Sequence, residues 1–182
     1  MKTNISILSI LVFTFFIQCK EKPEFINYKI PHLDASIKLP ASYVSLNERK
    51  FKKEDALLQK IYNANRKQTI LIDTTNNNNF IIILPATYQK IDSTVLYIFI
   101  DKERKKSSKT VTVDSMYFFG SRIGSIRNYK YIESKYQGIK KNNKDLFVKS
   151  IVISSATKTV GISFFSEKNP DTKPFIDSIS EL

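Results

Sequence analysis

The chain has 182 residues, one cysteine, one histidine and a formal net charge of +12 at pH 7. This length suits one domain with a substantial core, and the lone cysteine excludes internal disulfides and cysteine-based zinc sites. The positive charge favours an anionic partner. Alternatively, the lysine-rich composition reflects the codon usage of an A+T-rich genome together with a need for solubility.

The first segment has the pattern of a secretory signal peptide. Lys2 precedes an uncharged apolar run over residues 5–17. This run is shorter than the about 20 apolar residues that span a bilayer. No alanine occurs before Ala35, so the run is not followed by the small-residue site that ordinary signal peptidase requires. We therefore predict a signal peptide over residues 1–18 and a lipid on Cys19.

The segment resembles a bacterial lipoprotein signal of the Bacteroidetes type, in which Cys19 is followed directly by charged residues. Gln18 departs from the lipobox, which has a small residue before the cysteine. The resemblance implies an envelope protein anchored by lipid to the outer membrane, on its periplasmic side or at the surface. We expect a tether over residues 19–29 and one domain over residues 30–182. Nucleic acid is not an expected partner of an exported chain.

The first half of the domain predicts short strands and one helix. Residues 53–67 place apolar side chains at helical spacing. Asparagines over residues 74–79 indicate a loop, and the apolar run over 80–84 indicates a buried strand that ends at Pro85. The other strands are expected at 35–39, 41–46 and 69–73.

Residues 92–106 fit both a strand and a helix. Residues 95–100 have strand composition, but the apolar spacing is helical, and Asp92 or Ser93 could cap the first turn. Cations gather at the other end, as helix C-termini prefer. We predict a helix.

The second half predicts a strand, then an antiparallel meander of three strands, then a helix. Strands are expected at 110–119, 126–137, 145–154 and 159–165, with turns at 120–125, 140–143 and 156–158. Gly138 suggests a turn and Gly161 a bulge. The terminal helix begins near Asn169, and its apolar stripe consists of Phe175, Ile176, Ile179 and Leu182.

The sequence contains no recognisable catalytic or metal-binding motif, so neither a catalytic residue nor a cofactor is predicted. His32 lies near the expected tether, without neighbouring nucleophiles or ligands. The glycines at 120–125 do not have the spacing of a phosphate-binding loop. Carboxylates occur as local pairs that read as solvated or capping groups: Glu54 with Asp55, Asp101 with Glu103, and Asp171 with Asp177.

Two lysine-rich stretches are candidate partner surfaces. One lies at the end of the predicted helix, and the other interleaves tyrosine with lysine on a predicted strand. Such side chains can bind sugars or phosphates by stacking and charge, although cross-strand pairing on a solvated sheet face explains the tyrosines equally well. The candidates are Lys102, Arg104, Lys105, Lys106, Tyr129, Lys130, Tyr131 and Tyr136.

The order of elements, from the strand ending at Leu39-Pro40 to the final strand and helix, resembles the Mog1/PsbP-like fold. The resemblance implies an α+β domain with a central antiparallel sheet flanked by helices (α/β/α). It also implies an adaptor or assembly factor, most of which lack catalytic residues. We expect a monomeric, non-catalytic lipoprotein that binds an envelope protein or anionic lipid headgroups. The alternatives are a toxin-protecting lipoprotein and an envelope hydrolase that uses carboxylates.

Overall fold

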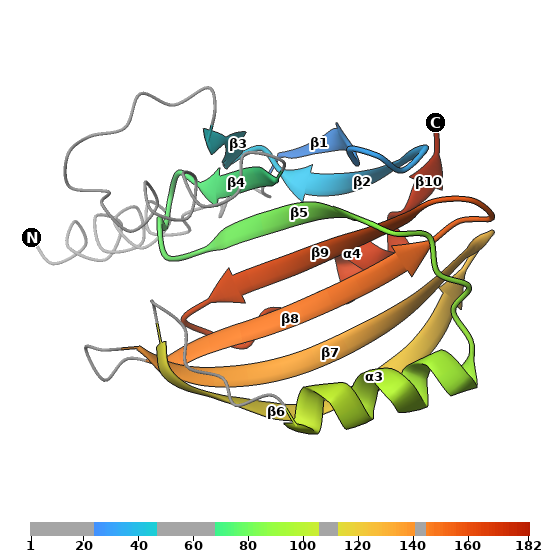
Figure 1. Ribbon diagram of the computed structural model, residues 1–182. Coiled ribbons are helices and arrows are strands. Elements are labelled where there is room, and N and C mark those ends of the chain that lie inside the picture. The colour runs from blue at the N-terminus through green and yellow to red at the C-terminus, as the bar shows by residue number, and fades with distance from the viewer. Residues whose placement is uncertain (1–23, 47–67, 106–112, 141–144) are drawn as a thin grey trace, which may run out of the picture.

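Two antiparallel sheets make up most of the structure, a computed structural model that describes residues 24–46, 68–105, 113–140 and 145–182 (Figure 1). The expected α/β/α arrangement is wrong, because these residues are mostly β and include only two helices. One face of the larger sheet is covered chiefly by a second sheet instead of a layer of helices. The signal peptide, Cys19, the helix at 53–67 and Lys106 lie outside the described residues.

The larger sheet has seven strands in the order β3-β4-β5-β9-β8-β7-β6. The predicted meander is confirmed, since β7, β8 and β9 are neighbours in chain order, and β6 extends it. Strand β9 also pairs with β5, which joins the meander to the first half of the domain. The bounds are β3 (Tyr43–Ser45), β4 (Thr69–Asp73), β5 (Phe80–Ala86), β6 (Val113–Ile126), β7 (Tyr129–Lys140), β8 (Asp145–Ser154) and β9 (Thr159–Ser166).

The smaller sheet brings the two ends of the described chain together. It consists of β1 (Phe25–Lys29), β2 (Ala35–Pro40) and β10 (Ser180–Glu181), in the order β1-β2-β10. The segment expected to be a tether therefore contains a strand, which pairs with β2 along its whole length. The loop after Pro40 leads to β3, which joins the other sheet rather than extending β2.

The terminal helix is shorter than predicted. Helix α4 (Lys173–Asp177) ends after five residues, and the chain returns to an extended conformation as β10. The hydroxyl groups of Ser36 and Ser180 lie 2.9 Å apart where β10 meets β2. Of the expected stripe, Ile176 and Ile179 are buried, whereas Leu182 is exposed beyond the strand.

The main core lies between the smaller sheet with α4 and one face of the larger sheet, which we call the inner face. Alternate residues of β8 and β9, including Ile151, Ile153 and Ile162, point into it. Ile37 of β2 and Ile176 of α4 meet them from the other layer. Each such side chain contributes roughly 1.5–3 kcal/mol by leaving water.

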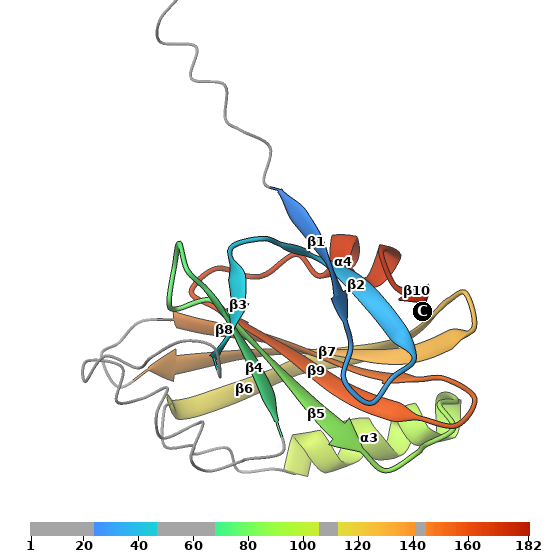
Figure 2. The ribbon, with the colours of Figure 1, turned by 90° about the horizontal axis from the view of Figure 1, so that it is seen from above.

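Helix α3 (Ser93–Lys105) packs on the opposite face of the larger sheet, the outer face (Figure 2). The helix prediction for this segment is confirmed. Asp92 caps it, because its Oδ1 accepts a hydrogen bond from the backbone N–H of Val95 at 3.0 Å. Its apolar stripe, which includes Phe99, is only half-buried. Among the described residues, no helix is long and apolar enough to cross a membrane.

The turn between β6 and β7 lies later than predicted, at Arg127 and Asn128, and Arg127 has a φ of 51°. Strand β6 runs on through Gly120 and Gly124, with a break in register next to Gly120. Gly124 leaves room for the ring of Tyr131, which would overlap a Cβ at this position. The turn predicted at Gly138 and the bulge predicted at Gly161 are also wrong, since the register is continuous at both.

The loop predicted at residues 74–79 is confirmed as the connection between β4 and β5. Asp73 stabilises it by accepting hydrogen bonds from the N–H and the hydroxyl of Thr75 at 2.9 and 2.6 Å. These bonds, with others from Ser42 and Asn79, outweigh burial and lower the pKa of Asp73. Burial and the charge of Asp73 raise the pKa of Tyr43 to about 12. This carboxylate has a structural role in the hairpin.

Candidate functional site

The predicted tyrosine and lysine surface is divided between the two faces of the larger sheet. Successive residues of a strand point to opposite faces, so Tyr129 and Tyr131 belong to the inner face and Lys130 and Tyr136 to the outer face. Tyr129 is buried, and its hydroxyl donates a hydrogen bond to the carbonyl oxygen of Asp34 at 3.0 Å. Burial is the main cause of the raised pKa of Tyr129. Tyr131 packs against the main core.

Tyr136 joins the sheet to the end of α3. Its hydroxyl donates a hydrogen bond to Oε2 of Glu103 at 3.0 Å, and its ring packs against Phe118. Burial, then the charge of Glu103 and this hydrogen bond, raise the pKa of Tyr136. Lys102 and Arg104 are exposed on α3, and Lys105 is its last residue. The eight candidates therefore do not form one surface.

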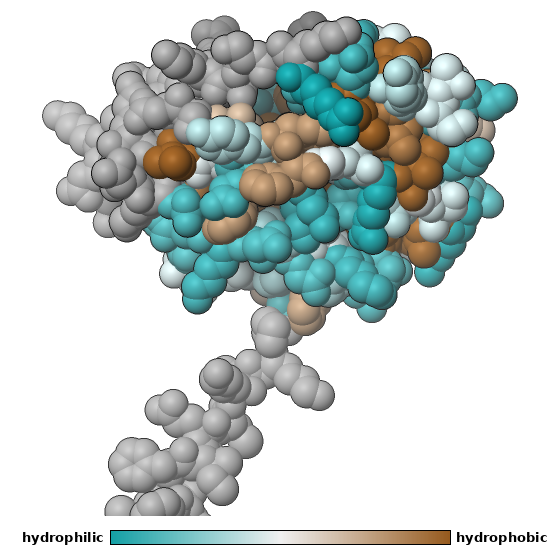
Figure 3. All heavy atoms as spheres, turned by 90° about the horizontal axis from the view of Figure 1, so that it is seen from below, coloured by the Kyte–Doolittle hydropathy of each residue, from teal (hydrophilic) through white to brown (hydrophobic). Residues whose placement is uncertain are grey.

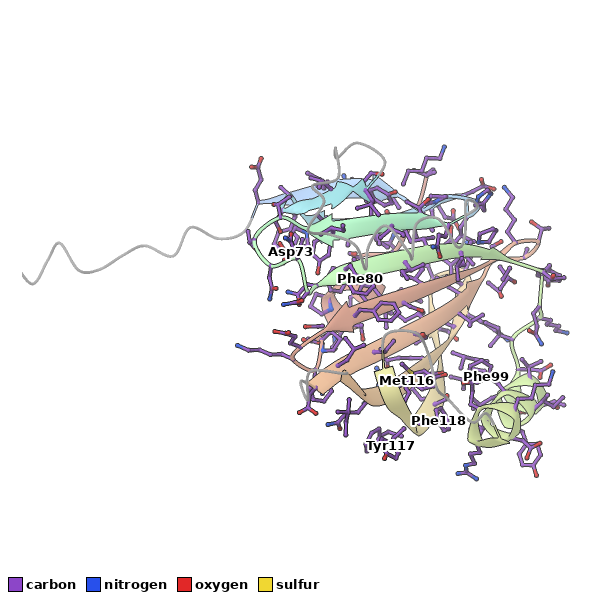
Figure 4. The ribbon with its side chains drawn as sticks, turned by 60° about the vertical axis from the view of Figure 1, so that its left-hand side comes forward. Asp73, Phe80, Phe99, Met116, Tyr117 and Phe118 are labelled. Atoms are coloured by element: carbon purple, nitrogen blue, oxygen red, sulfur yellow. The ribbon has the colours of Figure 1, made fainter. Side chains whose placement is uncertain are left out.

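Apolar side chains interrupt the hydrophilic surface near α3 and β6. Figure 3 shows hydrophobic patches among hydrophilic atoms on the face seen from below. The exposed large apolar side chains of these two elements include Tyr97, Ile98, Tyr117 and Phe119. Tyr117 points away from Phe118 and Phe99, which lie on the side of α3 (Figure 4). Tyr117 therefore belongs to the inner face, where its pairing with Gln137 also places it.

The other candidates from the sequence lie apart from one another. His32 is exposed in the turn between β1 and β2, with a φ of 65°. Asp101 and Glu103 are on α3. Asp171 accepts a hydrogen bond from the backbone N–H of Lys173, whose side chain pairs with Asp177 at the surface. The pair of Glu54 and Asp55 lies outside the described residues.

A charged cluster on the inner face was not predicted. Its centre is Glu133 of β7, whose side chain is 1% exposed. Oε2 of Glu133 accepts a hydrogen bond from Nε of Arg122 in β6 at 2.5 Å. Oε1 accepts one from the hydroxyl of Thr172, just before α4, at 2.5 Å. The cluster thus joins the meander to the segment that leads into α4.

The strand register explains why these side chains meet. Arg122 lies directly opposite Glu133, and Glu133 lies opposite Ile151 of the main core. Residues directly opposite one another in antiparallel strands point to the same face. Lys135 and Lys149 are each two residues along from this row, so they share the inner face.

The environment of Glu133 keeps its carboxyl group ionised. Burial disfavours the charged form. The hydrogen bonds from Thr172 and Arg122, together with the charges of Arg122 and Lys149, outweigh that effect and lower the pKa of Glu133. The carboxylate therefore acts as a fixed negative charge that holds the side chains around it.

Positive charges outnumber this carboxylate. Lys135 and Lys149 lie directly opposite each other on β7 and β8, an arrangement of like charges that destabilises a sheet unless a counter-charge is near. Lys149 is only 9% exposed. With Arg122 they give three cations for the one carboxylate of Glu133. The cluster can therefore attract an anion from outside the domain.

A signal for this cluster was present in the sequence. Arg122 and Glu133 are opposite charges that pair if the hairpin turns at residues 127 and 128. Because of the glycines at 120–125, the turn was predicted there, too early in the chain. Arg122 was therefore expected in the turn and not opposite Glu133. Thr172 could not be found in this way, because the contact depends on how the loop before α4 crosses the sheet.

Comparisons of the sequence with protein-family models and with curated proteins give no match. A comparison of the structure finds the solution structure of cyanobacterial PsbP (CyanoP) from Synechocystis sp. PCC 6803. The TM-score is 0.53 at 8% sequence identity, over 90% of this chain and 96% of that chain. The PsbP-like fold that the order of elements suggested is confirmed by this likeness, which concerns the fold alone.

Proposed function

We propose that this chain is a bacterial lipoprotein, anchored to the cell envelope through Cys19, whose domain is a non-catalytic binding or assembly module. The apolar segment before Cys19 supports the anchor. The observation that carries the binding role is the cluster around Glu133, which combines one fixed carboxylate with three cations. Its partner would carry negative charge.

The lowered pKa of Glu133 favours binding over catalysis at this cluster. A general acid works best when its pKa is raised towards the working pH. The pKa of Glu133 is shifted the other way, and both its oxygens accept hydrogen bonds. A glycosidase-like mechanism would also require a second carboxyl group facing it, whereas Glu133 faces Arg122, Lys149 and Thr172.

The anchor can be tested by mass spectrometry of the chain recovered from bacterial membranes. We expect an N-terminus at Cys19 that carries acyl mass, and loss of both features in Cys19→Ala. Gln18→Gly, which restores the small residue of the lipobox, serves as a matched variant and should be processed at least as completely as the wild type. Recovery of the wild-type chain with Met1 intact and without acyl mass would contradict the proposal.

The non-catalytic role can be tested with a panel of envelope hydrolase substrates. We expect no turnover above that of a heat-inactivated sample. Turnover that Glu133→Gln abolishes while the fold is retained would show instead that this carboxylate is catalytic.

A further inference from the structure

We propose that Arg122, Lys135 and Lys149 form a binding surface for the phosphate groups of anionic lipids in the membrane that holds the chain. This inference rests on the proposed function, because Cys19 would bring the domain to that membrane. The three cations come from neighbouring strands β6, β7 and β8 and share the inner face.

Lys135, which pairs with Lys149, is open to solvent. Among the described residues, no ion pair involves it. It lies opposite Lys149 on one side and Gly120 on the other. Gly120 has no side chain, and nothing lies within 4 Å of the position its Cβ would occupy. An anion can therefore approach the ammonium group of Lys135 from the side of β6, whereas Lys149, which is 9% exposed, adds its positive charge from within the cluster.

Arg122 presents most of its side chain to solvent. Its guanidinium contacts Glu133 through Nε alone, and its side chain is 61% exposed. A guanidinium group has four further N–H donors on its terminal nitrogens, and its planar fork matches two oxygens of a phosphate. Glu133, which is held by Thr172, thus fixes Arg122 in place without using the part that would bind a ligand.

Carboxylates near this surface are already engaged. Asp145, at the start of β8, accepts a weak hydrogen bond from Gln137 at 3.5 Å. Asp171 accepts one from the N–H of Lys173 at 3.0 Å. These neutral donors hold the two carboxylates in place without cancelling their charge, so the excess of positive charge is confined to Arg122, Lys135 and Lys149 around Glu133. By contrast, Lys102 and Arg104 on α3 alternate with Asp101 and Glu103, so that element has little net charge.

The position of the N-terminus favours a lipid as the source of the phosphate. Strand β1 and α4 lie on one side of the larger sheet and α3 on the other (Figure 2). The described chain thus begins on the inner side, near exposed Phe25 and Ile26, which are 52% and 39% accessible. Tyr117 is also exposed on the inner face. Of these side chains, Tyr117 is the one close to Lys135, because it lies opposite Gln137, two residues further along β7. An aromatic side chain next to cations is typical of surfaces that lie at a membrane interface.

The proposal can be tested with the full chain in neutral detergent, by titration with soluble dihexanoyl phosphatidylglycerol. Dihexanoyl phosphatidylcholine, inorganic phosphate and an acidic peptide (polyglutamate) are titrated in parallel. We expect binding of phosphatidylglycerol that is at least tenfold tighter than that of phosphatidylcholine and that weakens as salt increases. Because one lysine near an anionic membrane is worth about 1 kcal/mol, Lys135→Gln should weaken it about fivefold.

The matched control is Lys102→Gln, which removes the same charge from an exposed position on α3 and should leave binding unchanged. Equal effects of the two substitutions would overturn the proposal, because they would indicate a response to net charge alone. Equal binding of inorganic phosphate, or binding of polyglutamate without binding of the lipid, would also overturn it in favour of a free anion or a protein partner. The titration does not require acylation of Cys19, so its failure is distinct from failure of the anchor.

Discussion

The two faces of the larger sheet satisfy their polar groups in opposite ways. On the outer face, neutral hydroxyls pair across neighbouring strands: Ser121 with Ser134 at 2.7 Å, and Ser150 with Ser163 at 2.7 Å. On the inner face, Glu133 is surrounded by charged and hydroxyl donors. The first arrangement is complete within the domain, whereas the second has unbalanced positive charge.

The hydroxyl pairs of the outer face serve packing, whereas the cations of the inner face can also serve binding. A pair of hydroxyl groups has no charge at any ordinary pH, and its hydrogen bond is complete without an external ligand. Like charges held opposite each other, as Lys135 and Lys149 are, cost free energy that a bound anion recovers. We therefore expect substitutions on the outer face to change stability alone, and substitutions of exposed cations on the inner face to change binding.

Glu133→Gln should have the largest effect on stability. It removes the negative charge of a buried ion pair and leaves the amide oxygen as the one side-chain acceptor where Glu133 has two. Loss of one partner of a buried pair costs 3–5 kcal/mol, and the exposure of Arg122 puts the expected loss near the lower end, at about 3 kcal/mol. Urea unfolding measures it. Asp177→Asn, whose carboxylate pairs with Lys173 at the surface, is the control and should cost less than about 1 kcal/mol.

Acid should weaken the same cluster, to a smaller extent than the substitution, because a protonated carboxyl keeps both oxygens as acceptors. The pKa of Glu133 is lowered in the fold from an ordinary value of 4.5. Its contribution to stability is therefore present above about pH 4.5 and is lost as the pH falls through the lower, folded value. The difference in unfolding free energy between wild type and Glu133→Gln should shrink across that window. A constant difference down to pH 3 would contradict this account.

Gly124→Ala should come next, at a cost of about 1–3 kcal/mol, because the new methyl group overlaps the ring of Tyr131. Gly161→Ala is the matched control in the same sheet. The nearest atom to its Cβ would be the carbonyl oxygen of Leu84, at 3.9 Å, and the substitution should be neutral or stabilising by up to about 1 kcal/mol. Thermal unfolding of both variants provides the comparison. Equal destabilisation would show that the contact with Tyr131 is unimportant.

Ser134→Ala should have the smallest effect, about 1 kcal/mol, as expected for loss of one neutral hydrogen bond. The double variant Ser121→Ala with Ser134→Ala should lose less than the sum of the two single variants, because neither partner is left unpaired. Neither change should alter lipid binding. A loss of binding in Ser134→Ala with unchanged stability would break the distinction between the faces.

Local patterns predicted the strands and the longer helix well. The alternating side chains of β8 and the apolar run of β5 reflect which positions are buried, so these strands can be recognised from the sequence. Asp92 caps α3, as its position suggested. The end of the chain was wrong because its apolar residues fit both helix and strand, and pairing of Ser180 with Ser36 decided between them. That contact joins residues 144 positions apart, which no local pattern encodes.

The candidate stretch of tyrosine and lysine is divided between two faces for a related reason. In the sequence, Tyr129, Lys130 and Tyr131 form one basic aromatic stretch. In β7, however, successive side chains point to opposite faces, so Lys130 lies on the outer face and the two tyrosines on the inner face. Lys149 is the only cation in β8, so the sequence of that strand does not indicate an anion site. The site becomes evident only from the register, which places Lys135 opposite Lys149. The cluster around Glu133 thus depends on register, which in turn depends on the turn at Arg127 and Asn128.

The central claim is that the inner face, and not α3, binds anionic lipid. Backbone amide chemical shifts of the full chain in neutral detergent test it directly, before and after addition of dihexanoyl phosphatidylglycerol. We expect changes at residues 120–122, 133–137 and 147–151, with α3 unaffected. Changes that are confined to residues 93–105, or spread evenly over the surface, would contradict it.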